Sequence, residues 1–424
     1  MLDSTKADAY IAILKEELLL ATGCTEPIAI AYCASRLRDV LGQSPERIEA
    51  EVSGNILKNV KSVIVPNTGG LKGISAAVAA GVVAGNAHKV LQVISSVDEK
   101  QFEEIRTYME QTPVEVHCTD TQRMLDIRIT GYAGEDRAVV HIANNHSNIV
   151  YEEKNGKVFK EHPLVDSDED NLQDKSVLNV EDIIEFANTV DLQRIRPLLE
   201  NQIKYNSAIA EEGLKGEWGA NIGKVLLADF GGDIKTEAKA YAAAAPDARM
   251  SGCELPVVIV TGSGNQGITA SLPVVRYAKH MGASEEQLYR ALLVSDLITI
   301  HQKTGIGRLS AYCGAVSAGC GAGAGIAYLE GGDYKTIAHT IVNAVAILSG
   351  TICDGAKPSC AAKIAEAVEA GILGYHMYVH DQQFRDGDGI VAKGVENTIA
   401  NVGRLAKQGM RETDETILKI MCGK

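Results

Sequence analysis

Residues 309–329 contain no charged side chain and consist mostly of Gly, Ala, Ser and Cys. The whole chain has 41 Gly residues but only five Phe and one Trp, so large rings cannot fill its core. Ala, Val, Ile and Leu must fill it instead, and small side chains let neighbouring helices approach closely. The stretch is too poor in strongly apolar residues for a membrane span. We therefore expect a buried helix that its neighbours contact closely, and no membrane partner.

The length and the charge of the chain limit its organisation and its partners. Its 424 residues exceed the usual size of one domain. A formal net charge of −14 argues against nucleic-acid binding, which needs basic patches. The first residues lack the apolar core of an export signal. We therefore expect a cytoplasmic protein in which the nine cysteines are thiols or metal ligands rather than disulfides.

The hydrophobic pattern predicts a mostly α domain with small-residue-rich helices, into which a small α+β sandwich is inserted. The helical domain is discontinuous and comprises residues 1–87 and 175–424. Residues 88–165 form the inserted domain, and the acidic residues 166–174 form a linker. In the first half of the chain, helices are predicted at 6–20, 27–41, 74–83 and 99–111. Strands are predicted at 48–52, 62–66, 90–95, 114–117, 125–130, 137–142 and 149–151.

Three cysteines lie in Gly- and Ala-rich surroundings near the C-terminal end, namely Cys313, Cys353 and Cys360. A long interval followed by a close pair indicates a cage built from two segments, with space for a bulky inorganic group. Three thiolates can hold a [4Fe–4S] cluster and leave one iron without a protein ligand, and such an iron is a Lewis acid. The alternative is three buried cysteines without a ligand, because free cysteine is often buried. Zinc is another alternative, although the usual close double pairing of cysteines is missing.

Cys24 lies in the segment Ala21-Thr-Gly-Cys24-Thr-Glu-Pro27. Thr25 is a good cap residue and Pro27 fits a first helical turn, which places Cys24 at a helix N-terminus. A cysteine in that position is expected to have a lowered pKa and to act as a nucleophile or a general base. The alternative is that Cys24 is only a small residue in a tight turn.

The segment Thr261-Gly-Ser-Gly-Asn-Gln-Gly267 follows an apolar run and enters a predicted helix. It lacks the Lys and Ser or Thr of a phosphate-binding loop. Gly264, Asn265 and Gly267 can instead hold a carboxylate, because backbone N–H groups at a helix start bind anions. A plain strand-to-helix turn is the alternative.

A polar cluster of Asn55, Lys58 and Asn59 interrupts apolar sequence and suits recognition of an α-amino acid. A solvated loop is the commoner meaning of such a cluster. His301 and Lys303 lie just upstream of the first cysteine of the trio and are expected to line the same pocket.

These segments together resemble the iron–sulfur L-serine dehydratase superfamily, and most closely its single-chain branch associated with L-cysteine desulfidase. The segment around Cys24 is similar to the Ser-His-Thr-x-Gly-Pro loop of the dehydratases, with Cys in place of His. Thr351-Ile-Cys353-Asp is similar to the family's Thr-Cys-Asp-Pro segment, and Cys360 matches the third ligand at a shorter interval. Cys320 matches a cysteine that does not bind the cluster. Cys422 is compared with a C-terminal cysteine that covers the open iron in some dehydratases.

The resemblance covers nearly the whole chain and implies a catalytic helical domain with a [4Fe–4S] cluster on Cys313, Cys353 and Cys360. It implies that Cys24 is the base and that Thr25 lies in the substrate site. The implied reaction is β-elimination of L-cysteine to sulfide, pyruvate and ammonia. A homodimer is expected.

Three other functions remain open. The first is L-serine dehydratase, which releases hydroxide in place of sulfide. The second is a pyridoxal-dependent lyase, for which Lys204, Lys235 and Lys303 are candidate carriers. The third is a sensor that binds an amino acid or a redox signal without turnover.

Overall fold

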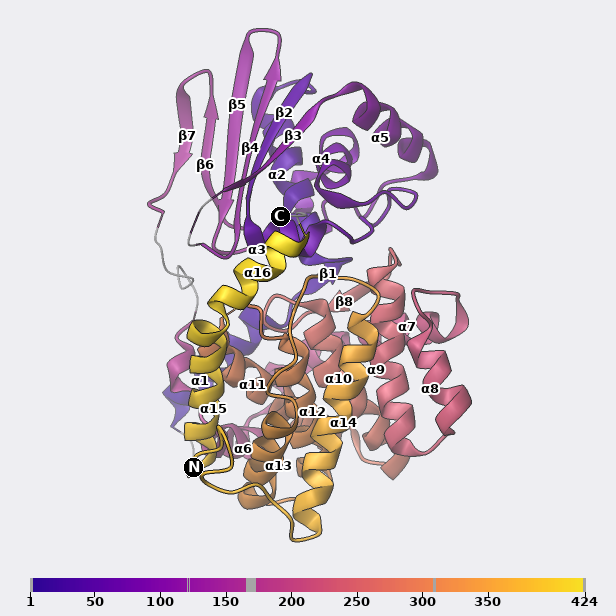
Figure 1. The fold of residues 1–424 in the computed structure, drawn as a ribbon, viewed down its shortest axis with the longest axis vertical. Helices are drawn as coiled ribbons and strands as arrows, with labels where there is room; N and C mark the ends of the chain where they lie inside the picture. The colour runs from indigo at the N-terminus through magenta and orange to yellow at the C-terminus, as the bar shows by residue number, and fades with distance from the viewer. Residues whose placement is uncertain (1–2, 120, 122, 165–172, 308–309, 422–424) are drawn as a thin grey trace.

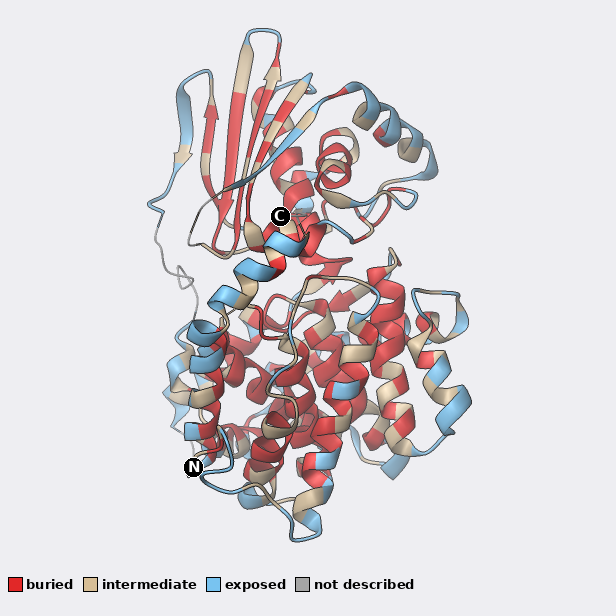
Figure 2. Cartoon of the chain, in the orientation of Figure 1, coloured by how far each residue is buried: buried red, intermediate tan, exposed pale blue. Residues whose placement is uncertain are grey.

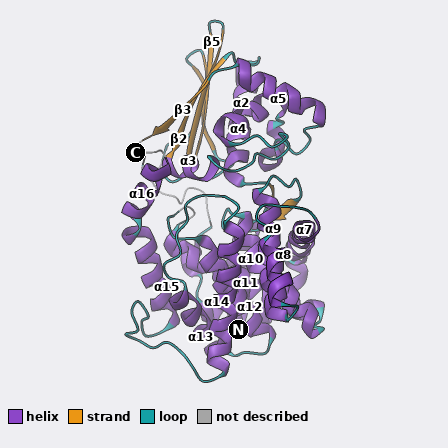
Figure 3. Ribbon diagram, turned by 45° about the vertical axis from the view of Figure 1, so that its right-hand side comes forward, coloured by secondary structure: helices purple, strands orange, loops and turns teal. Residues whose placement is uncertain are grey.

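The computed structural model describes residues 3–119, 121, 123–164, 173–307 and 310–421. The elements form two lobes stacked along the long axis, with a sheet in one lobe and a bundle of helices in the other (Figure 1). Seen from the side, the long strands gather at one end of the molecule (Figure 3). The mostly helical fold with a smaller sheet is therefore confirmed.

The sheet lobe is built on six strands in the order β3-β2-β4-β5-β6-β7. The β2–β3 pair is parallel, and the other pairs are antiparallel. Side chains alternate along most of β2, so Ile48, Ala50 and Val52 are buried while Arg47, Glu49 and Glu51 are partly exposed. The strands are β2 (Arg47–Ser53), β3 (Val114–Thr119), β4 (Asp126–Ala133), β5 (Asp136–Ala143), β6 (Ile149–Lys154) and β7 (Lys157–Glu161).

Helices α2 (Thr25–Leu41), α4 (Gly73–Ala84) and α5 (Glu99–Gln111) lie together beside the sheet, and α2 contacts β4 and β5 (Figure 1). The helices α2 and α4 pack almost backbone to backbone. A Cβ atom on Gly81 would lie 2.2 Å from the carbonyl oxygen of Ala31, so only glycine fits there. One apolar cluster joins these helices to the strands. Strand β2 and the helices α2 and α4 of the sheet lobe thus come before residue 88 in the sequence. The predicted domain limits at 88 and 165 stay a prediction.

The helical lobe surrounds α12, whose side chains are nearly all buried (Figure 2). This confirms the buried helix that the uncharged stretch predicts. A short antiparallel pair, β1 (Leu20–Thr22) with β8 (Pro256–Val258), and helix α3 (Gly54–Val60) lie towards the sheet lobe. The helices of the lobe and its edge are α1 (Ser4–Glu17), α6 (Val180–Thr189), α7 (Arg196–Lys215), α8 (Ile222–Phe230), α9 (Ile234–Met250), α10 (Gly264–Met281), α11 (Glu285–Ile306), α12 (Gly314–Leu329), α13 (Tyr334–Ile347), α14 (Cys360–Val379), α15 (Val395–Arg404) and α16 (Arg411–Met421).

Two predicted strands are wrong. Residues 90–95 overlap a 3₁₀ helix (Ala87–Gln92), because the apolar side chains of Val93 and Ile94 join the cluster beside α2 without a partner strand. Residues 62–66 contribute only an isolated bridge between Ile64 and Lys72. Strand β7 was not predicted.

The first helix ends at Glu17 rather than near residue 20, because Leu20–Thr22 pairs with β8. The predicted acidic linker falls mostly on residues outside the described ranges. No helix in the described part of the chain is long and apolar enough to cross a membrane.

Candidate active site

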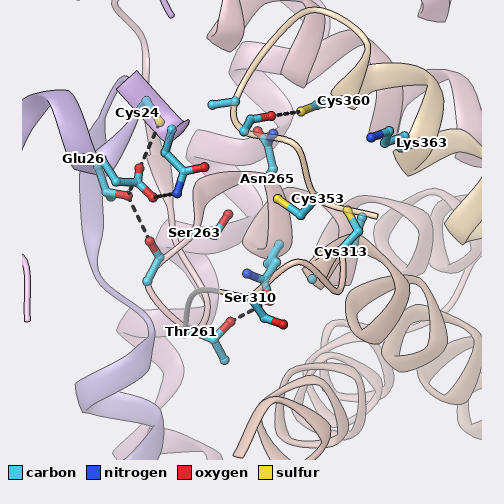
Figure 4. A pocket seen from close by; sticks show the side chains of 18 of the residues that line it. Cys24, Glu26, Thr261, Ser263, Asn265, Ser310, Cys313, Cys353, Cys360 and Lys363 are labelled. Carbon is cyan, nitrogen blue, oxygen red and sulfur yellow. Dashed lines mark hydrogen bonds between the residues drawn. The ribbon is translucent and has the colours of Figure 1, made fainter. Parts of the chain in front are cut away.

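Four helices begin at one pocket, which has a volume of about 110 Å³ and is lined from both lobes (Figure 4). Cys24 is the N-cap of α2, Ser263 that of α10 and Cys313 that of α12, while Cys360 is the first residue of α14. All four residues line the pocket. Because helix N-termini carry partial positive charge, their convergence favours anionic groups inside the pocket.

The backbone brings the two segments of the cysteine trio together. Tyr312 and Ile352 form an antiparallel bridge, and the Cys353 N–H donates to the Ala311 carbonyl over 2.6 Å. The thiols of Cys313 and Cys353 interact, and the interaction shifts the pKa of each. Cys360 Sγ lies 3.7 Å from the carbonyl oxygen of Gly355. The prediction that these three cysteines share one cavity therefore agrees with the geometry, and all three are free thiols.

The electrostatics of the trio favour one thiolate. The interaction with Cys313 lowers the pKa of Cys353, assisted by the positive charges of Lys58 and Lys357, although burial opposes the shift. The same interaction, together with burial, raises the pKa of Cys313. Burial also raises the pKa of Cys360. A second and a third thiolate would need a further positive group in the pocket, such as a metal centre.

Cys24 is a buried thiol, and the lowered pKa predicted for it is wrong. Burial raises the pKa of Cys24 well above its usual value, and the Glu26 carboxylate raises it further. The positive charge of Arg249 acts in the opposite direction but does not prevail. Cys24 Sγ donates a hydrogen bond to Glu26 Oε2 over 3.1 Å, so a proton acceptor lies directly beside the thiol.

Glu26 is the centre of a hydrogen-bond network. Thr25 Oγ1 lies 3.0 Å from Glu26 Oε2, and Asn59 Nδ2 donates to Glu26 Oε1 over 3.3 Å. Thr25 Oγ1 also lies 3.0 Å from the carbonyl oxygen of Gly262. The network connects α2, α3 and the loop before α10, and it fixes the carboxylate that faces Cys24.

Gly264 and Gly267, in the first turn of α10, allow close packing and do not line the pocket. A Cβ atom on Gly264 would lie 2.5 Å from Arg249 Nε, and one on Gly267 would lie 2.1 Å from the Val258 carbonyl oxygen. The pocket is lined instead by Gly262, Ser263, Asn265 and Gln266. Of the three predicted carboxylate-binding residues in this loop, the structure therefore brings only Asn265 into the pocket.

The predicted polar cluster is split. Lys58 and Asn59 line the pocket, whereas Asn55 Nδ2 points to Met124 Sδ, 3.1 Å away, and Asn55 is not in the lining. Lys303 lines the pocket as predicted. His301 does not, because its Nε2 lies 2.7 Å from a carboxylate oxygen of Glu396.

Two other cysteines, Cys320 and Cys422, do not join the trio in the described part of the pocket. Cys320 is buried in α12, where its thiol lies 3.6 Å from the Ile341 carbonyl oxygen and outside the pocket lining. Cys422 lies outside the described residues. Of the candidate pyridoxal lysines, Lys204 and Lys235 are also outside the lining, which leaves Lys303.

A model of the serine dehydratase alpha chain family matches residues 86–419 of this chain. The chain belongs to that family. It is also similar to proteins named UPF0597 across nearly its whole length. One from Desulfitobacterium hafniense is 59% identical over 412 residues, covering 97% of this chain and 96% of the relative. One from Treponema denticola is 46% identical over 428 residues, with 99% of both chains covered.

The family is known for iron–sulfur-dependent enzymes, and the trio of thiols fits such a cluster. No three His, Cys, Asp or Glu side chains within the described ranges converge closely enough to hold a single metal ion. A four-iron cluster does not require such convergence, because each ligand binds a different iron and needs only to face a shared cavity. Cys313, Cys353 and Cys360 meet that condition.

Three charged residues of the pocket were not predicted from the sequence, namely Glu26, Arg249 and Lys363. Glu26 stands two positions after Cys24, so a carboxylate in the first helical turn was a readable signal. Arg249 and Lys363 carry no local motif. Only the packing of α9 and α14 brings them to the pocket.

Proposed function

We propose that this protein is a [4Fe–4S]-dependent carbon–sulfur lyase that converts L-cysteine to sulfide, pyruvate and ammonia. The observation that carries the proposal is the meeting of four cysteines, Cys24 and the trio, in one pocket of a serine dehydratase-like chain. Cys313, Cys353 and Cys360 would hold the cluster. When bound, the cluster supplies an open iron that acts as a Lewis acid on the leaving group.

The residues around Cys24 transfer the α-proton of the substrate. Glu26 accepts the hydrogen bond from the Cys24 thiol, and it takes the thiol proton so that the sulfur can remove the α-proton of the substrate. Thr25 and Asn59 hold the carboxylate in place during this transfer. Base catalysis of this kind contributes about 10²- to 10⁴-fold in rate.

The bond changes balance without an outside oxidant. The electron pair of the Cα–H bond forms the Cα=Cβ bond, and sulfide leaves with the electrons of the Cβ–S bond. The product, aminoacrylate, becomes its imine and is hydrolysed by one water to pyruvate and ammonia. We also propose that the enzyme is cytoplasmic and works as a homodimer, and light scattering of the purified protein tests the homodimer.

L-serine dehydratase is the second candidate, because the family model is that of the serine dehydratase alpha chain. The same pocket would then release hydroxide. In the segment that carries the base, this chain has Cys24 where the dehydratases have His. This difference supports the sulfur substrate. Rates of pyruvate formation from L-cysteine and L-serine under one set of conditions distinguish the two.

The first experiment is an anaerobic purification followed by a visible spectrum and assays of sulfide and pyruvate. A broad iron–sulfur band with sulfide release from L-cysteine is the expected result. A colourless, inactive protein that retains zinc would contradict the proposal and favour a sensor. Loss of activity on borohydride reduction, with a modified Lys303 and no iron, would favour a pyridoxal enzyme.

Cys24→Ala tests the base. The variant is expected to keep the absorbance of the cluster and to lose turnover by at least about 10²-fold, the lower limit for base catalysis. Cys118→Ala is the matched control, because Cys118 is an exposed cysteine on β3 outside the pocket lining. Equal rates for Cys24→Ala and Cys118→Ala would rule out Cys24 as the base.

A further inference from the structure

Arg249 is a buried cation beside the candidate base. It lies near the end of α9, is 3% exposed and lines the pocket. Its Nη2 donates to the Gly23 carbonyl over 2.7 Å, and its Nη1 donates to Asn265 Oδ1 over 2.9 Å. Its buried Nε has no hydrogen-bond partner among the described residues. A guanidinium has five N–H donors, so Arg249 can donate further hydrogen bonds to a ligand.

No carboxylate within the described ranges lies at ion-pair distance from Arg249. The acidic residue of the pocket lining, Glu26, accepts hydrogen bonds from Cys24, Thr25 and Asn59 instead. A buried charge without a partner is costly, and proteins keep one where a ligand or a partner compensates it. Arg249 is therefore placed to receive an anion.

Two other cations of the lining, Lys58 and Lys363, already have carboxylate partners. Lys58 forms an ion pair with Asp414, and Lys363 lies 2.6 Å from Asp354. The charge of Lys58 lowers the pKa of Cys353 and that of Lys363 lowers the pKa of Cys360, so both lysines act on the cysteine trio. Arg249, by contrast, is bonded to the carbonyl of Gly23 and its charge acts on Cys24, so it is a cation on the Cys24 side of the pocket.

We propose that Arg249 binds the α-carboxylate of the substrate and thereby selects small α-amino or α-hydroxy carboxylic acids. The proposal rests on the function proposed above and sharpens it. Because Arg249 is bonded to the carbonyl of Gly23, a carboxylate on its guanidinium lies beside Cys24, and the adjoining Cα–H can face the sulfur. Asn265 orients the guanidinium through its side-chain oxygen. The planar fork of arginine matches a carboxylate with two parallel hydrogen bonds.

The test measures binding rather than turnover, so it can be read even if the elimination reaction is absent. L-alanine is the probe, because it has the carboxylate and amino group of the substrate but no leaving group. The full-length holoprotein is titrated by calorimetry with L-alanine and with L-alaninamide, which lacks the anionic charge. Wild type is expected to bind L-alanine and to bind the amide at least about 10-fold more weakly, since hydrogen bonds to charged groups are strong.

Two variants of Arg249 and one control complete the test. Arg249→Gln is expected to weaken L-alanine binding about 10- to 100-fold, and Arg249→Lys to weaken it less, because the charge remains without the fork. Arg38→Gln is the matched control. Arg38 also donates to main-chain carbonyls, of Val82 and Gly85, but it lies outside the pocket lining.

Several outcomes would overturn the proposal. The first is a wild type that binds neither compound, or that binds the amide as tightly as L-alanine. The second is an Arg249→Lys variant that its melting curve shows to be folded but that binds L-alanine no better than Arg249→Gln. The third is an Arg249→Gln variant that binds L-alanine like wild type. Sulfide release with any of these results would refute the role of Arg249 and leave the lyase intact. Carboxylate binding through Arg249 without sulfide or pyruvate would refute the lyase alone.

Discussion

At the scale of single residues, the setting of Cys24 shows which of two opposed effects prevails. A helix N-terminus stabilises a nearby negative charge by about 0.3–1 kcal/mol, which would lower a thiol pKa modestly. Complete burial penalises the thiolate by up to several pKa units. Here burial and the Glu26 carboxylate prevail, so Cys24 rests as a thiol. A motif that identifies a helix start therefore does not by itself predict an activated cysteine.

Asp296 offers a prediction on stability and pH. This side chain on α11 is fully buried and accepts a hydrogen bond from Gln202 Nε2 over 2.9 Å. Its other oxygen has no partner within the described ranges. Burial raises the pKa of Asp296 to about 7, against the lowering effect of the Gln202 hydrogen bond. The carboxyl group is therefore mostly neutral in the folded protein at acidic pH.

The sign of the pH dependence follows from that shift. Between about pH 4 and pH 7 the folded state holds a proton that the unfolded state has lost, so stability falls as pH rises. The slope from this one group approaches about 1.4 kcal/mol per pH unit. Asp296→Asn removes the titration. We expect the melting temperatures of variant and wild type to be similar near pH 4, with the variant higher at pH 7.5. A constant difference across this range would contradict the shift.

At the scale of elements, helices with a clear apolar face and caps were predictable, and short apolar runs were not. The helix Glu99–Gln111 begins at a capping box on Asp98, a local signal that the sequence displays. Residues 90–95 have the composition of a strand, but they overlap a 3₁₀ helix because their apolar side chains pack beside α2. The sequence predicts that the three cysteines of the trio share one site. It does not predict that Arg249 lies at the pocket, because that position depends on how α9 packs against α10.

The glycines between α12 and α14 govern the spacing of two candidate cluster ligands. Cys313 and Cys360 stand at the starts of these helices. Further along, a Cβ atom on Gly371 would lie 2.2 Å from the carbonyl oxygen of Gly319. Gly371→Ala is expected to force the helices apart and to destabilise the fold by about 1–3 kcal/mol, as overpacking does. Iron content should fall with it, because the starts of both helices shift.

Gly232→Ala is the control for Gly371→Ala. Nothing lies within 4 Å of a Cβ atom added at Gly232, so this variant should melt like wild type and keep its iron. Denaturation curves and an iron assay on the anaerobically purified proteins give both readouts. An unchanged midpoint and iron content for Gly371→Ala would show that the helix contact does not govern the cluster site.

At the scale of the whole molecule, α16 bridges the helical lobe and α3 at the edge of the sheet lobe (Figure 1). Lys58 on α3 forms an ion pair with Asp414 on α16, and Lys61 Nζ donates to the Met421 carbonyl. A Cβ atom on Gly54 would lie 2.5 Å from Leu418, so the two helices are in close contact. Since Lys58 also lines the pocket, α16 couples the attachment of the C-terminal end to the candidate active site.

Asp414→Asn tests that coupling. The Lys58 side chain is only 1% exposed, so loss of its partner leaves a buried charge uncompensated, which typically costs about 3–5 kcal/mol. We expect a melting temperature several degrees lower and faster proteolysis of α16. Glu415→Gln is the control on the same helix, because Glu415 lies 3.8 Å from Arg411 in an exposed pair that contributes about 0.3–0.5 kcal/mol. Equal melting temperatures for the two variants would mean that Lys58 finds another anion in the pocket, and that α16 does not secure the junction of the lobes.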